Sequence, residues 1–213
     1  MVRYDYKDSG IEWLGIIPKH WKLDRIRDNC VINDKALGNQ TQNETLINYL
    51  DIGNVNSKGI VDFNEIKELT FEEAPSRARR ITQKHDTVIS SVRTNLQAVA
   101  YIDFEKDNLI CSTGFFVCRP IHQTKLDNKF LYYFLLTEYS KEYFFSRSVG
   151  VSYPAIDDYK FGSINLPLPP LPEQRAIAAY LDKACRRIDD MIDIKQKQLE
   201  KLNGIRKAKI YKA

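Results

Sequence analysis

A proline-rich connector that leads directly into a long segment without proline restricts the fold of this chain more than any other feature. The prolines of the connector are Pro167, Pro169, Pro170 and Pro172. Each fixes φ and lacks a backbone donor, so the stretch should be extended and cannot join a central strand. Pro172 suits a first helical position, and Glu173 then lies in the first turn, where the helix dipole favours it. We therefore expect a globular domain over residues 1–172 and a helix over residues 173–213.

The expected helix contains one glycine, Gly204, and extends to about Lys212. Some 40 helical residues would span roughly 60 Å. Its apolar seam steps alternately by four and three residues, the spacing of a coiled coil. The seam consists of Leu181, Cys185, Ile188, Ile192, Lys195, Leu199 and Leu202. We expect a second long helix to cover the seam, and the alternative is a helix folded back on its own domain.

The preceding 172 residues are predicted to form an α+β domain with a mixed, curved sheet. Four short runs rich in β-branched or aromatic residues read as strands. These runs are Leu46–Ile52, Thr87–Ser91, Gln97–Ile102 and Gly114–Arg119. Residues 127–145 read as one or two amphipathic helices packed on the sheet, and residues 35–44 as a loop. The aromatic side chains of this domain fit a core better than a ligand platform.

Composition limits the class of protein. The net charge is +4, but residues 173–213 hold 11 Lys/Arg against 6 Asp/Glu, which leaves 21 against 22 in the domain. Total charge therefore identifies no polyanionic partner, and a local cluster must carry that argument. The four cysteines form no Cys-x-x-Cys pair, which argues against structural zinc and for reduced, mostly buried thiols. No membrane span or secretion signal is recognisable, so a cytoplasmic protein is expected.

Two segments have the residue types that contact nucleic acid. The first holds the cations Arg77, Arg79, Arg80, Lys84 and Arg93. Its end, Arg93–Gln97, follows an expected strand and presents a guanidinium, a hydroxyl and two amides, which suit guanine and adenine edges. The second, residues 147–154, is a glycine-containing loop with hydroxyls, a tyrosine and an arginine that suit phosphate and base-edge contacts. Ordinary solvated turns would explain either segment alone.

Signatures of catalysis are missing from the sequence. It contains no phosphate-binding loop, dinucleotide fingerprint, nucleophile elbow or adenine-methyltransferase tetrapeptide. Asp62, Glu65 and Lys67 faintly echo the carboxylate–carboxylate–lysine set of metal-dependent nucleases, a pattern common by chance. We therefore expect a non-catalytic chain without a metal site.

Both ends of the chain resemble one family. Residues 6–15 and 17–21 resemble the opening of type I restriction–modification specificity subunits. Residues 166–181 resemble the junction of their target recognition domain with a conserved spacer helix, and residues 150–156 a segment that closes this domain. The resemblance covers nearly the whole chain, and its middle is the part expected to vary with the DNA target.

The resemblance implies a fold, partners and a division of labour. A full specificity subunit has two recognition domains and two antiparallel helices. Each domain reads half of a split double-stranded DNA site, and the helices dock the methyltransferase subunits, through which the restriction subunit assembles. This chain resembles an N-terminal half, natural or truncated, whose homodimer would read an interrupted palindrome. S-adenosylmethionine, ATP and magnesium would bind only the partner subunits.

This reading gives residues their expected roles. Phosphate contacts are expected from Arg77, Arg79, Arg80 and Lys84. Base or groove contacts are expected from Arg93, Thr94, Asn95, Gln97, Ser152 and Tyr153. The helix pair is expected to form through Leu181, Ile188, Ile192, Leu199 and Leu202. One alternative is a truncated subunit that sequesters methyltransferase subunits without reading DNA. A stand-alone nuclease is a further alternative, which the missing catalytic set disfavours.

Overall fold

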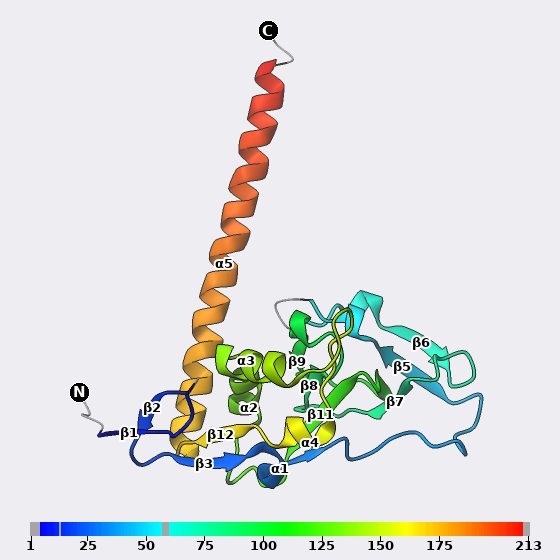
Figure 1. The fold of residues 1–213 in the computed structure, drawn as a ribbon. Helices are drawn as coiled ribbons and strands as arrows, with labels where there is room; N and C mark the ends of the chain where they lie inside the picture. The colour runs from blue at the N-terminus through cyan, green and yellow to red at the C-terminus, as the bar shows by residue number, and fades with distance from the viewer. Residues whose placement is uncertain (1–4, 13, 57–59, 211–213) are drawn as a thin grey trace. The chain divides into compact units, whose positions relative to one another are not determined.

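The computed structural model describes residues 5–12, 14–56 and 60–210, with the backbone alone for Phe63 and residues 208–210 (Figure 1). Trp13 of the opening motif and residues 211–213 at the end of the predicted helix lie outside the described part. The chain divides into two compact units, Met1–Arg175 and Ala176–Ala213.

One four-stranded sheet of the first unit has the order β6-β5-β10-β7. Its strands are β5 (Leu46–Leu50), β6 (Lys67–Thr70), β7 (Ala78–Ile81) and β10 (Leu109–Ser112). The pair β5–β10 is parallel and the other pairs are antiparallel, so the sheet is mixed. Short 3-10 helices, η1 (Ile52–Asn54) and η2 (Phe63–Glu65), lie between β5 and β6 in the chain.

A second four-stranded sheet, entirely antiparallel, has the order β4-β11-β8-β9. Its strands are β4 (Cys30–Ile32), β8 (Thr87–Ser90), β9 (Val99–Tyr101) and β11 (Phe115–Pro120). A short 3-10 helix, η3 (Thr94–Leu96), connects β8 to β9. The turn at Thr113 and Gly114 joins β10 of the first sheet to β11 of the second.

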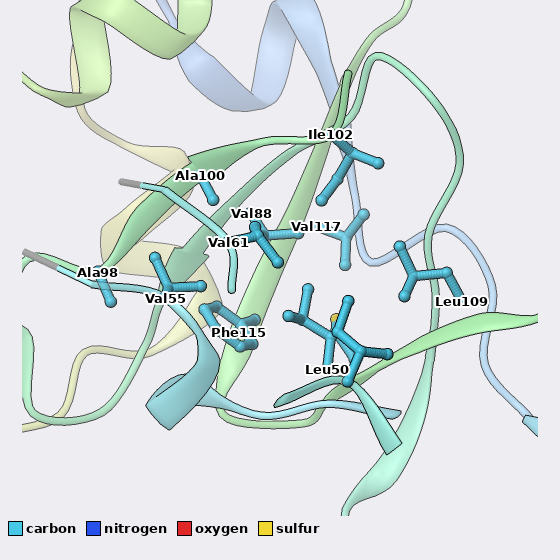
Figure 2. Close-up of a cluster of buried hydrophobic side chains, with 12 residues drawn as sticks. Leu50, Val55, Val61, Val88, Ala98, Ala100, Ile102, Leu109, Phe115 and Val117 are labelled. Carbon is cyan, nitrogen blue, oxygen red and sulfur yellow. The ribbon is translucent and has the colours of Figure 1, made fainter. Parts of the chain in front are cut away.

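The two sheets share a hydrophobic core, which Figure 2 shows. Leu50 and Leu109 come from the first sheet, and Val88, Ala100 and Val117 from the second. Successive side chains of a strand point to opposite faces of its sheet, so the residue after Leu109 faces away from this core. Ile110, the next residue of β10, packs in a separate cluster with Ile47, Tyr49 and Ala78.

Three helices add aromatic packing to the second sheet. They are α2 (Asn128–Leu135), α3 (Glu138–Arg147) and α4 (Asp158–Gly162). Phe116, whose side chain alternates with those of Phe115 and Val117, stacks on Phe161 of α4 at 4.4 Å between ring centroids. Phe144 of α3 also contacts Phe161, at 5.7 Å. Phe130, Phe134 and Phe144 are all buried, so the aromatic segment of residues 127–145 supplies core as expected.

Small elements at the two ends of the first unit complete it. The hairpin β1 (Tyr6–Asp8) and β2 (Ile16–Pro18) forms a sheet of its own, and α1 (Ile26–Asn29) precedes β4. The proline connector contributes β12 (Asn165–Leu168), which pairs antiparallel with β3 (Lys22–Arg25) in a two-stranded sheet. The connector is therefore extended at a sheet edge, as proline requires.

The long helix α5 (Leu171–Ile210) begins within the first unit. Both side-chain oxygens of Glu173 are bound, by His20 Nε2 at 2.8 Å and by Trp21 Nε1 at 3.1 Å. Gln174 is fully buried; its Nε2 donates to the carbonyls of Lys125 and Pro169, and its Oε1 accepts from the Asp127 amide. The first turn of α5 is thus fixed to the globular unit by polar side chains.

The α+β class and the long C-terminal helix are confirmed. Pro172 is the second residue of α5 and not the first, because Pro170 O accepts from the Glu173 and Gln174 amides and extends the helix backwards. The four predicted strands all occur, each with its ends within two residues of the expected positions. They are divided between two sheets, where the sequence suggested one. No helix of the described residues is long and apolar enough to span a bilayer.

Candidate nucleic-acid interface

The structure brings together the two segments that the sequence indicated separately. Residues 149 and 155 pair as a small hairpin, with amide-to-carbonyl bonds of 2.8 and 3.0 Å in the two directions. The hairpin lies against the segment after β8: the Ile156 amide donates to Ser91 O at 3.0 Å, and the Thr94 amide to Pro154 O at 3.3 Å. Residues 91–97 and 148–156 therefore form one surface, although some 60 residues separate them in sequence.

A stacked arginine–tyrosine pair lies at the centre of this surface. The Arg93 guanidinium lies 4.8 Å above the Tyr153 ring, and its Nη2 donates to the Tyr153 hydroxyl at 3.3 Å. Arg93 and Gln97, at the two ends of η3, both have left-handed backbones, with φ of 51° and 45°. Non-glycine residues adopt this region at an energetic cost, and such residues cluster at functional sites. Arg93 is exposed to solvent, and the Tyr153 ring stacks against one face of its guanidinium group.

The other candidates differ in exposure. Asn95 and Ser152 are exposed, so their amide and hydroxyl face solvent beside Arg93. Thr94 is buried, and its hydroxyl lies 2.7 Å from Ser148 Oγ, which binds η3 to the hairpin. Gln97 is half-buried and donates to the Leu135 carbonyl at 3.3 Å. The geometry gives Thr94 and Gln97 internal partners, while Asn95 and Ser152 remain available.

Arg77 lies at the same end of the two sheets. The Arg77 carbonyl accepts from the Thr113 amide at 2.7 Å. The carbonyl of Gly114, the residue after Thr113, accepts from the Ser91 amide at the same distance. Gly114 packs closely on its neighbours: a Cβ there would lie 2.8 Å from Ile52 Cδ1 and 3.3 Å from Val92 Cγ2, so the Ile52 side chain would have to shift. We call the surface formed by residues 51–54, 91–97, 113–114 and 148–156, together with Arg77, the loop end.

The charge at the loop end is partly balanced. The Arg77 guanidinium pairs with Asp51 and donates from Nε to the Tyr49 hydroxyl at 2.9 Å. These bonds, that to Asp51 first, raise the pKa of Arg77. Asp86, the one carboxylate among residues 77–97, is fully buried and bound by Arg119 through two bonds of 2.8 Å. Asp86 therefore contributes no negative charge to the surface that carries Arg93.

The remaining basic candidates lie in other surroundings. Arg79 stacks over Phe71, with 4.4 Å from Cζ to the ring centroid. Arg80 is half-buried, its Nε has no hydrogen-bond partner, and burial lowers the pKa of its guanidinium. Lys84 pairs with Glu105 at 3.2 Å in the turn that precedes β8, whereas Arg93 follows β8. Since β8 has four residues, about 13 Å of strand separates these turns.

Sequence reasoning missed two features of the loop end. The first is the pair of partners of Arg77: Tyr49 lies in β5, and Asp51 follows that strand. The parallel pairing of β5 with β10 brings both residues close to Arg77. Val151, at the tip of the hairpin, is fully exposed. An apolar residue between glycine and serine in a polar loop was the available signal.

The nuclease alternative gains no support from the geometry. Asp62 precedes η2, Glu65 is its last residue, and Lys67 begins β6. Asp62 Oδ1 accepts from the Asn64 amide at 3.0 Å, which gives it a local capping contact. Across the described residues, no group of three His, Cys, Asp or Glu side chains is arranged to hold a metal ion.

Comparison of the chain with known proteins identifies its family. The model of the family described as "Type I restriction modification DNA specificity domain" matches residues 18–203. The chain belongs to this family. The matched range includes η3, the hairpin of residues 149–155 and the seam of α5 through Leu202, so the specificity domain extends over both units.

Two curated relatives of this chain are longer than it is. The Type I restriction enzyme MjaVIII specificity subunit of Methanocaldococcus jannaschii is 25% identical over 210 residues, which cover 96% of this chain and 48% of that protein. The MjaIX specificity subunit of the same organism is 26% identical over 209 residues, 94% of this chain and 44% of that protein. The chain therefore spans about half the length of the curated relatives it matches.

A solved structure supports the same assignment. The HsdS subunit from Thermoanaerobacter tengcongensis superimposes with a TM-score of 0.74 at 27% identity, over 85% of this chain and 46% of that one. The α+β domain and the long helix thus recur in this HsdS subunit.

Proposed function

We propose that this chain is a non-catalytic DNA-reading component of a type I restriction–modification assembly and reads one half of a bipartite double-stranded site. The observation that carries the proposal is the loop end. Two segments distant in sequence converge there, fixed by backbone bonds, with Arg93, Asn95, Ser152 and Tyr153 on the exposed side. A guanidinium, an amide and hydroxyls held in fixed positions are the groups that distinguish base edges in the major groove.

The contacts divide into positioning and reading. Arg77 and Arg79 lie on or beside β7, and Arg77 shares its charge with Asp51; we assign both to phosphates, which fix the docking register without specifying sequence. Arg93 and Asn95 are assigned to base edges. Thr94 and Gln97 hold η3 in place through Ser148 and the Leu135 carbonyl.

The long helix is assigned to assembly. Ile188, Leu199 and Leu202 of the seam are more than half exposed, and Ile192 is 36% exposed. We propose that this seam pairs with the seam of a second copy, in a homodimer that also docks methyltransferase subunits. A two-fold dimer presents two equivalent loop ends, so its target is an interrupted palindrome. Methyl transfer from S-adenosylmethionine and ATP-dependent cleavage with magnesium belong to the partner subunits.

The test starts by selecting target duplexes from a random pool with the chain assembled with its methyltransferase subunits. Wild type and Arg93→Ala are then titrated with duplexes in which each base pair of the selected half-site is changed in turn. Loss of a bidentate contact predicts that Arg93→Ala no longer discriminates at one base pair, with about 1–3 kcal/mol lost there. Discrimination at the other positions is expected to remain.

Arg27→Ala is the matched control. Arg27 also lies over a tyrosine ring, 5.3 Å from that of Tyr159, but between α1 and α4. It should bind DNA as wild type does. Uniform weakening by Arg93→Ala across all duplexes would make Arg93 a phosphate contact. Assembly with methyltransferase subunits but no selected sequence would favour the decoy, a truncated subunit that sequesters them.

A further inference from the structure

The tip of the hairpin at the loop end carries an aliphatic side chain with no protein environment. Val151 has an exposed fraction of 100%, while the chain buries most of its other valines. The turn that presents it requires glycine before it: Gly150 has φ of 108°, and a Cβ there would approach Tyr153 O to 2.9 Å. The backbone is therefore folded back tightly, which places the Val151 side chain at the outermost point.

The tip is held from below. Residues 149 and 155 exchange two backbone bonds, Val92 and Ala155 form a further bridge, and Thr94 Oγ1 contacts Ser148 Oγ at 2.7 Å. Tyr153, two residues after Val151, stacks with Arg93. Because the turn is fixed before any ligand arrives, Val151 can contact a partner with little loss of backbone entropy.

The neighbours of Val151 identify the partner as polyanionic and mainly polar. Arg93 brings positive charge, and Asn95 and Ser152 bring hydrogen-bonding groups. On a duplex, the apolar group within reach of such a surface is the C5-methyl group of thymine, in the major groove. Most side chains that wedge between base steps, such as phenylalanine, leucine and methionine, are longer or bulkier than valine.

We propose that Val151 contacts a thymine C5-methyl group and thereby specifies one T·A pair of the half-site. This inference rests on the proposed DNA-reading function and adds a residue that recognises an apolar group to the polar set. It also explains why an aliphatic side chain occupies the most exposed position of the hairpin, between Gly150 and Ser152.

The experiment removes the methyl group from the DNA and the valine from the protein separately. Each thymine of the selected half-site is replaced by deoxyuridine, which leaves base pairing unchanged. At one position the replacement should weaken binding by wild-type assembly roughly three- to fivefold, the value expected for exposing one buried methyl group. Val151→Ala should bind thymine DNA with a similar loss and show no further loss on the deoxyuridine duplex.

Val31→Ala is the matched control, because Val31 is an exposed valine on β4, at the opposite edge of its sheet from β9. It should retain the full response to deoxyuridine. Equal responses of wild type and Val151→Ala at every position, or a selected half-site without thymine, would overturn the inference and leave DNA reading intact. A Val151-dependent rise in 2-aminopurine fluorescence without coupling to deoxyuridine would identify a wedge and also overturn it. Absence of any selected sequence would overturn both proposals.

Discussion

The globular unit, Met1–Arg175, and the helical unit, Ala176–Ala213, differ in where their apolar side chains lie. In the globular unit, Phe115, Phe116 and Phe161 are all essentially inaccessible to solvent. In the helical unit, every described side chain from residue 185 to residue 207 is exposed, the large apolar ones included. Both units have a regular apolar pattern, but only the apolar side chains of the globular unit are buried by the chain itself.

The difference teaches that the two units gain stability in different ways. Burial of a large aliphatic or aromatic side chain stabilises by about 1.5–3 kcal/mol, so the globular unit draws its stability from contacts with itself. An isolated helix gains no such contribution from an exposed seam, and helices are mostly stabilised by packing of an apolar face. The seam of α5 is therefore the surface that we propose for assembly, whereas the exposed loop-end residues, such as Arg93, Asn95 and Ser152, can vary without disturbing the core.

The largest expected effect compares a core residue with a seam residue. Phe116→Ala removes a fully buried ring that stacks on Phe161 and should lower the free energy of unfolding by about 3–5 kcal/mol. Leu199→Ala, at a 60% exposed site, should change it by less than about 0.5 kcal/mol in dilute protein. Urea denaturation of both variants measures this. Equal losses would abolish the distinction between the two units.

The second prediction concerns self-association. Ile192→Asp places a carboxylate in the seam and should weaken the dimer about 100-fold, because an unpaired charge at an interface costs several kcal/mol. Ile194→Asp is the matched control: Ile194 is 55% exposed but lies two residues further along the helix, and so on another face. Sedimentation velocity over a concentration series separates them. Equal weakening would show that the seam has been assigned to the wrong face.

Thiol reactivity should sharpen the comparison further. Cys30, Cys111 and Cys118 are buried, and burial raises the pKa of Cys30 to about 12, so little reactive thiolate forms at neutral pH. Cys185 is exposed and belongs to the seam. A thiol-reactive dye should therefore label one cysteine per native chain, more slowly as protein concentration rises and seams pair. In Cys185→Ser, native labelling should disappear. A labelling rate independent of concentration would contradict the paired seam.

The smallest expected effect is a pH dependence in the globular unit. Asp157 caps α4, and the bond from the Lys160 amide to Oδ1 holds the pKa of its carboxyl below the ordinary value of 3.8. Since the folded pKa is the lower one, this contribution is present above about pH 4 and is lost as the pH falls through the folded pKa. Asp157→Asn, which keeps a capping side chain, should flatten the acid limb of stability measured by denaturation. An unchanged slope would remove the cap from this role.

The elements that could be predicted from the sequence are those with local signals. Asp127 and Thr137 cap α2 and α3, and the proline connector gave the start of α5 to within two residues. The strand β10 was not predicted, although it lies inside the first sheet. It is a four-residue run buried throughout, so it shows no alternation, and its parallel partner β5 lies some 60 residues earlier.

The candidate site was predictable by composition and not by arrangement. Arg93 and Tyr153 were both indicated as candidates, but their stacking depends on a contact between distant segments. Thr94 illustrates the limit, because nothing local shows that its hydroxyl faces Ser148 rather than solvent. Lys84 belongs to the same basic segment in sequence, yet the intervening strand β8 separates it from Arg93. Register and long-range pairing decide which members of a composition cluster act together.

The pairing of β3 with β12 places the entry and exit of the domain next to each other. Residues 26–164, which include the loop end, are the part of the chain between these two paired strands. Residues 26–164 could therefore be exchanged as a unit. Any replacement that keeps the β3–β12 pairing would leave the connection to α5 in the same register. If the loop end reads DNA as we propose, exchanging the chain between these two adjacent points should change the recognised sequence and leave the start of α5 unchanged.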